Sequence, residues 1–268
     1  MSGIHTSTSQ KTGNRQSGDV ILETSGLELA YGAFKAVDGV DLRIRRGTIH
    51  TIIGPNGAGK TTTFHCLTGE RRPTAGRILF DGSDVTRKPS QDRVGLGMSR
   101  SFQITSLFQT LSVRENLRLA AQGRDGAKAL AFWRPVGARP DHLKVADEII
   151  DRLQLGARAH VAAGELSHGQ QRVLEVGMAM AARPKLLLLD EPTSGMGIDD
   201  IPVMTKLIGE LGRDYTVMLI EHNMGIVMSI SDTITVMHQG KVLVEGDPRT
   251  VRNDPRVRAA YLGEAGAC

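Results

Sequence analysis

The segment from Gly54 to Thr61 reads GPNGAGKT and has the residue types needed to hold a chain of phosphate groups. Its two required glycines let the backbone curl so that successive N–H groups point at phosphate oxygens, and a helix beginning at Lys60 adds its positive end. Lys60 supplies a cation for the β- and γ-phosphates, and the Thr61 hydroxyl is a ligand for Mg²⁺. We therefore predict a nucleotide site formed by Gly54, Pro55, Asn56, Gly57, Ala58, Gly59, Lys60, Thr61 and Thr62.

A pair of carboxylates, Asp190 and Glu191, follows the apolar run LLLL and precedes Pro192. A fully apolar run of this length is typical of a buried parallel strand, and ligands of open α/β folds bind at the carboxyl ends of such strands. Asp190 is predicted to reach Mg²⁺ through water, and Glu191 to act as general base for an attacking water. The alternative is an acidic pair at the start of a helix; the phosphate loop makes it the weaker interpretation.

The stretch ELSHGQQR, residues 165–172, places Ser167 directly beside His168. A nucleophile and its base are normally assembled from distant residues, because adjacent side chains on one segment rarely face each other. The phosphate loop, the strand ending in Asp-Glu-Pro and the LSxGQ pattern ahead of it together resemble the ATP-binding cassette (ABC) family of transporter ATPases. The resemblance covers about residues 20 to 263. It implies an α/β fold: a P-loop NTPase (RecA-like) core, an antiparallel β subdomain and an inserted α-helical subdomain.

The resemblance also implies that two cassettes pair head to tail. Ser167, Gly169 and Gln170 would then close over ATP held by the partner, with the Ser167 hydroxyl and the Gly169 amide donating to its γ-phosphate. On this interpretation Ser167 binds phosphate and is not a nucleophile. His168 stands where the family most often has glycine, and Gly197 stands where it has Asp or Asn, so the coupling between the two sites depends on whether Asp199 takes that place.

Three further positions match the family. Gln103, in SRSFQ, would bond Mg²⁺ or the attacking water and link the core to the helical part; the alternative is a surface glutamine at a strand end. His222, 31 residues after Glu191, would contact the γ-phosphate. Tyr31, 23 residues before Gly54, would stack on adenine, with Phe34 as the nearby alternative.

Several strings resemble the ATPases of branched-chain and hydrophobic amino acid importers: SRSFQITSLFQTLSVRENL, IEHNM and the ending DPRVRAAYLGE. In that family two non-identical ATPases serve two transmembrane permease subunits and, indirectly, a substrate-binding protein. The second cassette that pairs with this chain would be identical or paralogous. The chain would then work at the cytoplasmic face of the membrane. Importers of urea or short amides share most of these strings, and a lipopolysaccharide exporter or a non-transport ATPase is more distant. Trp133 is expected to pack in the helical part or to contact the permease.

The elements that must position these groups alternate β and α. Residues 20–47 are predicted to form short antiparallel strands with glycines as turns, 48–53 a strand, 61–68 a helix and 76–82 a further strand pair. Helical spacing marks 113–121, 142–155 and 170–182. Strands at 185–190 and 216–221 alternate with helices at 201–212 and 223–230, and 233–247 form a hairpin that turns at Gln239–Gly240.

These patterns divide the chain into a polar disordered tail (1–19), a nucleotide-binding core with its β subdomain (20–96 and 183–250), a helical subdomain (97–182) and a C-terminal extension (251–268). Apolar residues make up 40% of the chain, and no apolar run is long enough to cross a bilayer. Two cysteines give no disulfide framework and no metal spacing. The net charge of +4 comes without a basic run interleaved with aromatics, which argues against nucleic acid as a partner.

Overall fold

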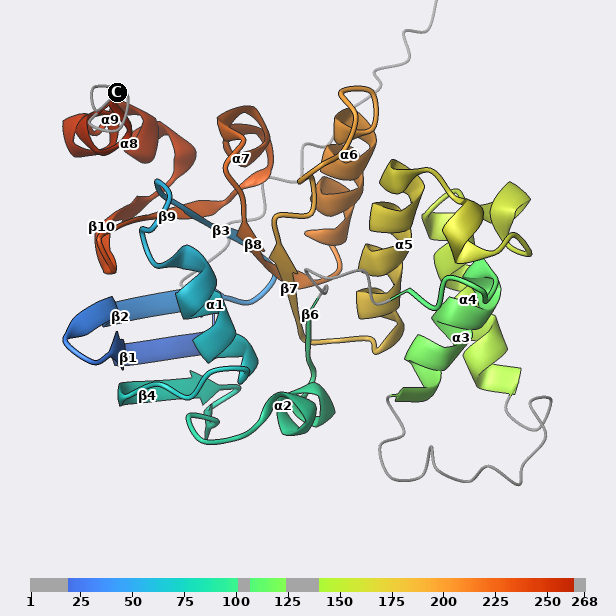
Figure 1. The fold of residues 1–268 in the computed structure, drawn as a ribbon, viewed down its shortest axis with the longest axis horizontal. Helices are drawn as coiled ribbons and strands as arrows, with labels where there is room; N and C mark the ends of the chain where they lie inside the picture. The colour runs from blue at the N-terminus through green and yellow to red at the C-terminus, as the bar shows by residue number, and fades with distance from the viewer. Residues whose placement is uncertain (1–18, 101–106, 124–139, 263–268) are drawn as a thin grey trace, which may run out of the picture.

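The structure is a computed structural model that describes residues 19–100, 107–123 and 140–262 (Figure 1). The predictions for Gln103, for Trp133 and for the tail up to residue 18 lie outside these residues. The described elements are, in chain order, β1 (Val20–Tyr31), β2 (Phe34–Arg45), β3 (Ile49–Ile53), α1 (Lys60–Thr68), β4 (Ala75–Phe80), β5 (Ser83–Asp84), α2 (Ser90–Leu96), β6 (Met98–Arg100), α3 (Val113–Gly123), α4 (Pro140–Arg152), α5 (His168–Ala181), β7 (Leu186–Asp190), α6 (Ile201–Leu211), β8 (Thr216–Ile220), α7 (Met224–Ile230), β9 (Thr233–His238), β10 (Lys241–Gly246), α8 (Pro248–Asn253) and α9 (Pro255–Leu262).

An antiparallel sheet in the order β2-β1-β4-β5 forms the first layer. The expectation of short strands at residues 20–47 was wrong: β1 and β2 are 12 residues each and turn once, between Tyr31 and Phe34. Gly26 and Gly39 lie inside the strands with positive φ, and the pairing shifts register between Thr24 and Leu27. Such irregularities let a long strand bend without ending.

A six-stranded sheet in the order β10-β9-β3-β8-β7-β6 forms the second layer. From β9 to β6 its neighbours are parallel, and only the β9–β10 hairpin is antiparallel. This hairpin turns at Gln239 and Gly240, as predicted, and both residues have the positive φ that a two-residue type I′ turn requires. Strands β3, β8 and β7 are consecutive in the sheet, so the segments that follow them leave from one edge.

Two apolar cores cover the two faces of this second sheet. Leu186 and Leu188 pack with α1 and the antiparallel sheet, whereas Leu187 and Leu189 pack with α5, α6 and the helical part. The alternation follows from the strand geometry, which sends successive side chains to opposite faces. Figure 1 shows the result: α1 lies between the two sheets, and α3, α4 and α5 form a separate group beyond β7.

The boundaries differ from prediction at several places. Helix α1 begins at Lys60, as predicted for the helix that follows the phosphate loop, although the helical pattern was assigned only from residue 61; α5 spans His168–Ala181 where 170–182 was expected. The predicted start of the helical subdomain at residue 97 precedes β6, which pairs with β7 and belongs to the core sheet. The predicted start of the C-terminal extension at residue 251 falls inside α8.

None of the helices in the described ranges combines the length and the apolar character that a bilayer crossing requires.

Candidate nucleotide-binding and hydrolysis site

The loop between β3 and α1 is held by backbone from two other parts of the chain. A Cβ on Gly54 would lie 2.2 Å from the Met237 carbonyl oxygen of β9, and one on Gly59 would lie 2.4 Å from the Ala36 carbonyl oxygen of β2. Both glycines also have positive φ, 153° and 94°. No side chain fits at either position, and the loop is therefore fixed by close approach as well as by backbone conformation.

Helix α1 presents its N-terminus to this loop without a side-chain cap. Gly59 at the N-cap is left-handed, and no side chain bonds the first N–H groups, which have no acceptor inside the helix. The Lys60 side chain is buried, and its Nζ donates to the carbonyl oxygens of Gly54 and Pro55 at 2.6 and 2.9 Å. The loop thus gathers uncapped N–H groups and a cation at one point, which suits an anionic ligand.

Asp190 is the last residue of β7, and its carboxylate is buried. It is 6% exposed, and neither carboxylate oxygen has a hydrogen-bond partner. Burial raises the pKa of its carboxyl to about 6; the neighbouring Glu191 charge acts in the same direction, and Arg100 and Lys60 oppose it. Two buried oxygens without partners, within electrostatic reach of Lys60, are suited to a cation or its water shell.

The side chains at this site suit a Mg²⁺ ion whose remaining ligands are phosphate oxygens of a nucleotide. The described residues contain no cluster of three or more His, Cys, Asp or Glu, so they form no all-protein metal centre. A site completed by phosphate oxygens needs fewer protein ligands: the half-buried Thr61 hydroxyl and Asp190 supply the hydroxyl and the carboxylate.

Glu191 and His222 leave the sheet from adjacent strands. Glu191 has a φ of 46°, rare for a residue with a side chain, and its N–H donates to the Ile220 carbonyl at 2.9 Å. His222 follows β8 two residues after Ile220 and is exposed. Since neighbouring strands lie about 5 Å apart, the two predicted groups share one edge of the sheet with the phosphate loop.

The sequence reasoning missed two residues at this edge of the sheet, Glu221 and Thr193. Glu221 is fully buried, and its carboxylate accepts hydrogen bonds from Thr193 and from the backbone after β8. The sequence did contain a sign of Glu221, because this carboxylate follows the apolar strand TVMLI just as Asp190 follows LLLL.

The LSHGQ segment, residues 166–170, lies at the start of α5, as predicted for a helix N-terminus. Ser167 is its N-cap: the Ser167 Oγ accepts from the Gln170 N–H at 3.2 Å, and the Gln170 Oε1 accepts from the Ser167 N–H at 3.1 Å. Ser167 and His168 are exposed, and the Ser167 hydroxyl proton remains available for donation. Ser167 is thus engaged in the capping box with Gln170 and follows the geometry of a helix N-cap.

The loop after Glu191 packs on the same helix end. A Cβ on Gly169 would lie 2.2 Å from an Asp200 carboxylate oxygen, and one on Gly195 would lie 3.2 Å from His168 Nε2. In Figure 1, α5 and α1 lie on opposite sides of β7 and β8. Within one chain, the N-terminus of α5 is therefore on the other side of these strands from α1, which follows the phosphate loop.

Tyr31 and Phe34 lie opposite each other across the β1–β2 turn and are 53% and 65% exposed. Two residues beyond Phe34, the Ala36 carbonyl touches the phosphate loop at Gly59. Both aromatics are therefore available beside the loop, and the geometry does not separate Tyr31 from Phe34 as the partner of a base.

The fold and this edge of the sheet define a phosphate-loop ATPase of the cassette type. Residues 37–194 match the family described as ABC transporter, and residues 241–267 match the family described as branched-chain amino acid ATP-binding cassette transporter. The chain belongs to the ATP-binding proteins of the branched-chain amino acid ABC transporter family. As a member, it is a transporter ATPase.

The alignments with its relatives cover nearly the whole length of both chains. The high-affinity branched-chain amino acid transport ATP-binding protein BraF of Pseudomonas aeruginosa is 41% identical, with 91% of this chain and 98% of that protein covered. LivG of Escherichia coli K12, a protein of the same description, is 39% identical over the same shares. Among solved structures, MJ1267, an ATP-binding cassette of an ABC transporter, superposes with a TM-score of 0.81 at 31% identity, covering 91% of this chain and 99% of that one.

Proposed function

We propose that this chain is the ATP-hydrolysing subunit of an importer of branched-chain and other hydrophobic amino acids. It would act as a head-to-tail pair with a second cassette, identical or paralogous, at the cytoplasmic face of the membrane through two permease subunits. A substrate-binding protein would deliver the amino acid from the other side. The names of BraF and LivG support the substrate class.

The single observation that carries the hydrolytic part is the pair of buried Asp190 oxygens without partners beside the uncapped loop of Lys60. When bound, Mg²⁺ neutralises charge on the β- and γ-phosphates of the substrate ATP. Thr61 and Asp190 would hold it, with Gln103 as a further ligand. The loop N–H groups and the Lys60 Nζ, which now bonds two loop carbonyls, would bind the phosphates.

The remaining residues would act on water and on the γ-phosphate. Glu191 orients the attacking water and accepts its proton, because its side chain leaves the sheet one position after Asp190. His222 contacts the γ-phosphate from the next strand. Ser167 and the Gly169 N–H of the partner cassette donate to the same phosphate, and Tyr31 stacks on adenine.

Two variants test the hydrolytic assignment. Lys60→Ala should abolish tight ATP binding, whereas Glu191→Gln should keep ATP affinity, lose turnover and accumulate a stable dimer in size-exclusion chromatography with ATP and Mg²⁺. Rapid turnover by Glu191→Gln would refute its role as the base, and unchanged affinity in Lys60→Ala would refute the phosphate cradle.

The substrate class is tested by uptake. Cells that lack this chain but retain its permease and binding-protein partners should lose uptake of labelled leucine, isoleucine and valine, and wild-type chain but not Lys60→Ala should restore it. Loss of urea or short-amide uptake with leucine uptake intact would favour the alternative importer. Co-purification of the chain from its native membranes would identify the permease and the second cassette.

A further inference from the structure

Glu221 is a buried carboxylate that joins two loops of the proposed site. It is 0% exposed and follows the last residue of β8. Its Oε1 accepts from the Thr193 hydroxyl at 2.5 Å and from the Thr193 N–H at 3.3 Å. Its Oε2 accepts from the N–H groups of His222 and Asn223 at 3.1 and 3.3 Å. Four donors therefore satisfy a charge that would otherwise be costly to bury.

Each of the two oxygens serves a different strand end. Oε1 holds the loop that follows β7, in which Thr193 is two residues beyond Glu191. Oε2 holds the segment that follows β8 and begins with His222. The backbone bond from Glu191 N–H to the Ile220 carbonyl, 2.9 Å, joins the same two strands just inside the edge. The Glu221 carboxylate thus extends the strand pairing beyond the point where the ladder ends.

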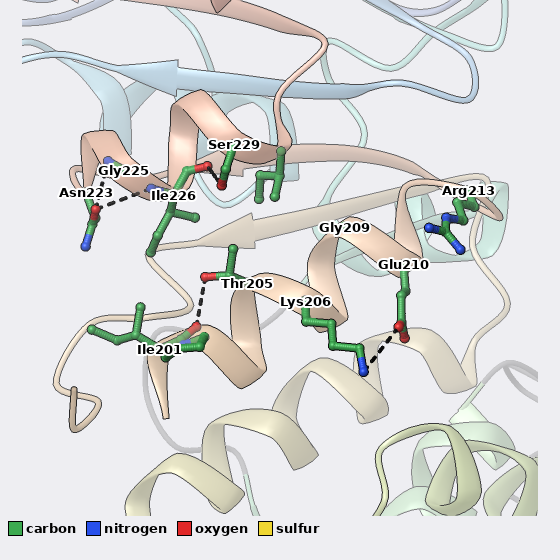
Figure 2. A pocket seen from close by; sticks show the side chains of 12 residues that line it. Ile201, Thr205, Lys206, Gly209, Glu210, Arg213, Asn223, Gly225, Ile226 and Ser229 are labelled. Atoms are coloured by element: carbon green, nitrogen blue, oxygen red, sulfur yellow. Dashed lines mark hydrogen bonds and ion pairs between the residues drawn. The ribbon is translucent and has the colours of Figure 1, made fainter. Parts of the chain in front are cut away.

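The second loop is also fixed on its far side. The Asn223 side chain accepts from the N–H groups of Gly225 and Ile226 at 3.0 and 3.3 Å and so caps α7 (Figure 2). His222 lies between this cap and Glu221, so its backbone has few ways to move. Glu191 has no comparable cap, and its positive φ must be held by the surrounding contacts.

We propose that Glu221 is a positioning residue for ATP hydrolysis: its carboxylate, through Thr193 on one side and the His222 amide on the other, sets the relative placement of Glu191 and His222. The inference rests on the proposed function, because it assigns Glu221 no contact with nucleotide or water. The residue acts in the transition state through others. Loosening it should therefore lower kcat while leaving the nucleotide affinity, which depends on the loop of Lys60, unchanged.

The test compares matched variants of the full-length chain in a steady-state ATPase assay with Mg²⁺. Thr193→Val removes the hydroxyl at nearly constant shape, and Thr193→Ser keeps it. Glu221→Gln replaces one accepting oxygen with a donor that faces N–H groups. Thr205→Val, on α6, is the same chemical change at a hydroxyl that bonds only its own helix, at the Ile201 carbonyl (2.8 Å).

We expect kcat to fall at least tenfold in Thr193→Val and Glu221→Gln, with KM for ATP within twofold of wild type. Thr193→Ser should keep most of the wild-type kcat, and Thr205→Val should match wild type. The double variant Thr193→Val/Glu221→Gln should lose no more kcat than Glu221→Gln alone. Thermal unfolding of each variant is measured alongside.

Unchanged kcat in both Thr193→Val and Glu221→Gln would overturn the inference. So would a loss of kcat in the double variant equal to the two single losses combined, or a rise in KM as large as the fall in kcat. A kcat of Thr193→Ser as low as that of Thr193→Val would overturn it as well. If Glu221→Gln fails to fold, the Thr193 pair decides alone. Failure of the proposed function is a separate result: the wild-type chain would then show no ATPase activity above that of Lys60→Ala.

Discussion

Acidification should remove a large part of the stability that His50 gives the fold. His50 is buried in β3 at 1% exposure, and its Nε2 lies 2.8 Å from the Thr235 Oγ1. The Thr235 hydroxyl donates its one hydrogen to Glu245 at 2.7 Å, so it must accept from His50, which fixes the neutral ring with the proton on Nε2. Burial lowers the pKa of His50 from 6.5 to about 4.

The sign follows from which state binds more protons. Below pH 6.5 the unfolded chain protonates its histidine while the folded protein does not, so this stability is fully present above pH 6.5 and is lost as the pH falls toward 4. At about 1.4 kcal/mol per pH unit, the loss between pH 6.5 and 5 is about 2 kcal/mol. Asp190 acts in the opposite direction: its raised pKa, about 6, favours the folded state as the pH falls from 6 toward 3.8.

Because the two effects overlap, wild type alone would show little slope near pH 5. The measurement is therefore urea unfolding of wild type and His50→Gln at pH 7.0, 6.0 and 5.0, with chelator and without nucleotide. The difference in unfolding free energy between the two proteins should shrink by about 2 kcal/mol from pH 7 to 5. A difference that stays constant within about 0.5 kcal/mol would show that His50 titrates normally, and the argument from burial would fail.

Three substitutions test other parts of the framework. Arg93 donates to the carbonyls of Cys66 and Leu67 at the end of α1 and to the carbonyl of Lys88 ahead of α2, and its burial lowers its pKa to about 10. Arg93→Met should reduce the unfolding free energy by about 3 kcal/mol in urea titration, because three charge-assisted bonds outweigh the burial cost. Gly59→Ala, which meets backbone, should weaken ATP binding in calorimetry far more than a matched Gly57→Ala, where a Cβ meets nothing within 4 Å. Gly169→Ala should lower the melting temperature, and adding Asp200→Ala should restore part of it, because the Asp200 Cβ would still lie 2.9 Å from the added methyl group.

The parts of the site that are contiguous in sequence were predictable. The phosphate loop carries its own glycines, lysine and hydroxyl, and its position between a strand and a helix follows from the apolar runs on either side. Asp190 could be placed at the same edge because parallel strands end together. The start of α5 was also readable: Ser167 and Gln170 have the spacing of a capping box, and the prediction nevertheless began the helix at Gln170.

The parts that depend on which strands are neighbours were not predictable. Glu221 contacts Thr193, 28 residues earlier in the chain, only because β8 is inserted between β3 and β7. Likewise, the carbonyls of Ala36 and Met237 that exclude side chains from Gly59 and Gly54 come from two hairpins far apart in sequence. Periodicity defines strands and their faces, but it does not give the order of strands in a sheet.

The segment from Glu191 to Asp200 is the physical link between the sheet edge and the helical part. At its start, Thr193 is held by Glu221, and at its end, Asp200 lies against Gly169 at the N-terminus of α5. Gly197, between these contacts, has no side chain, whereas Asp199 is exposed next to the Asp200 contact. A displacement of α5 relative to β7 must therefore either break the Asp200 contact or pull on the segment that carries Glu191. Since the other end is fixed by the hydrogen bonds of Glu221, the strain would fall on the residues between Thr193 and Asp200, where two glycines can absorb it.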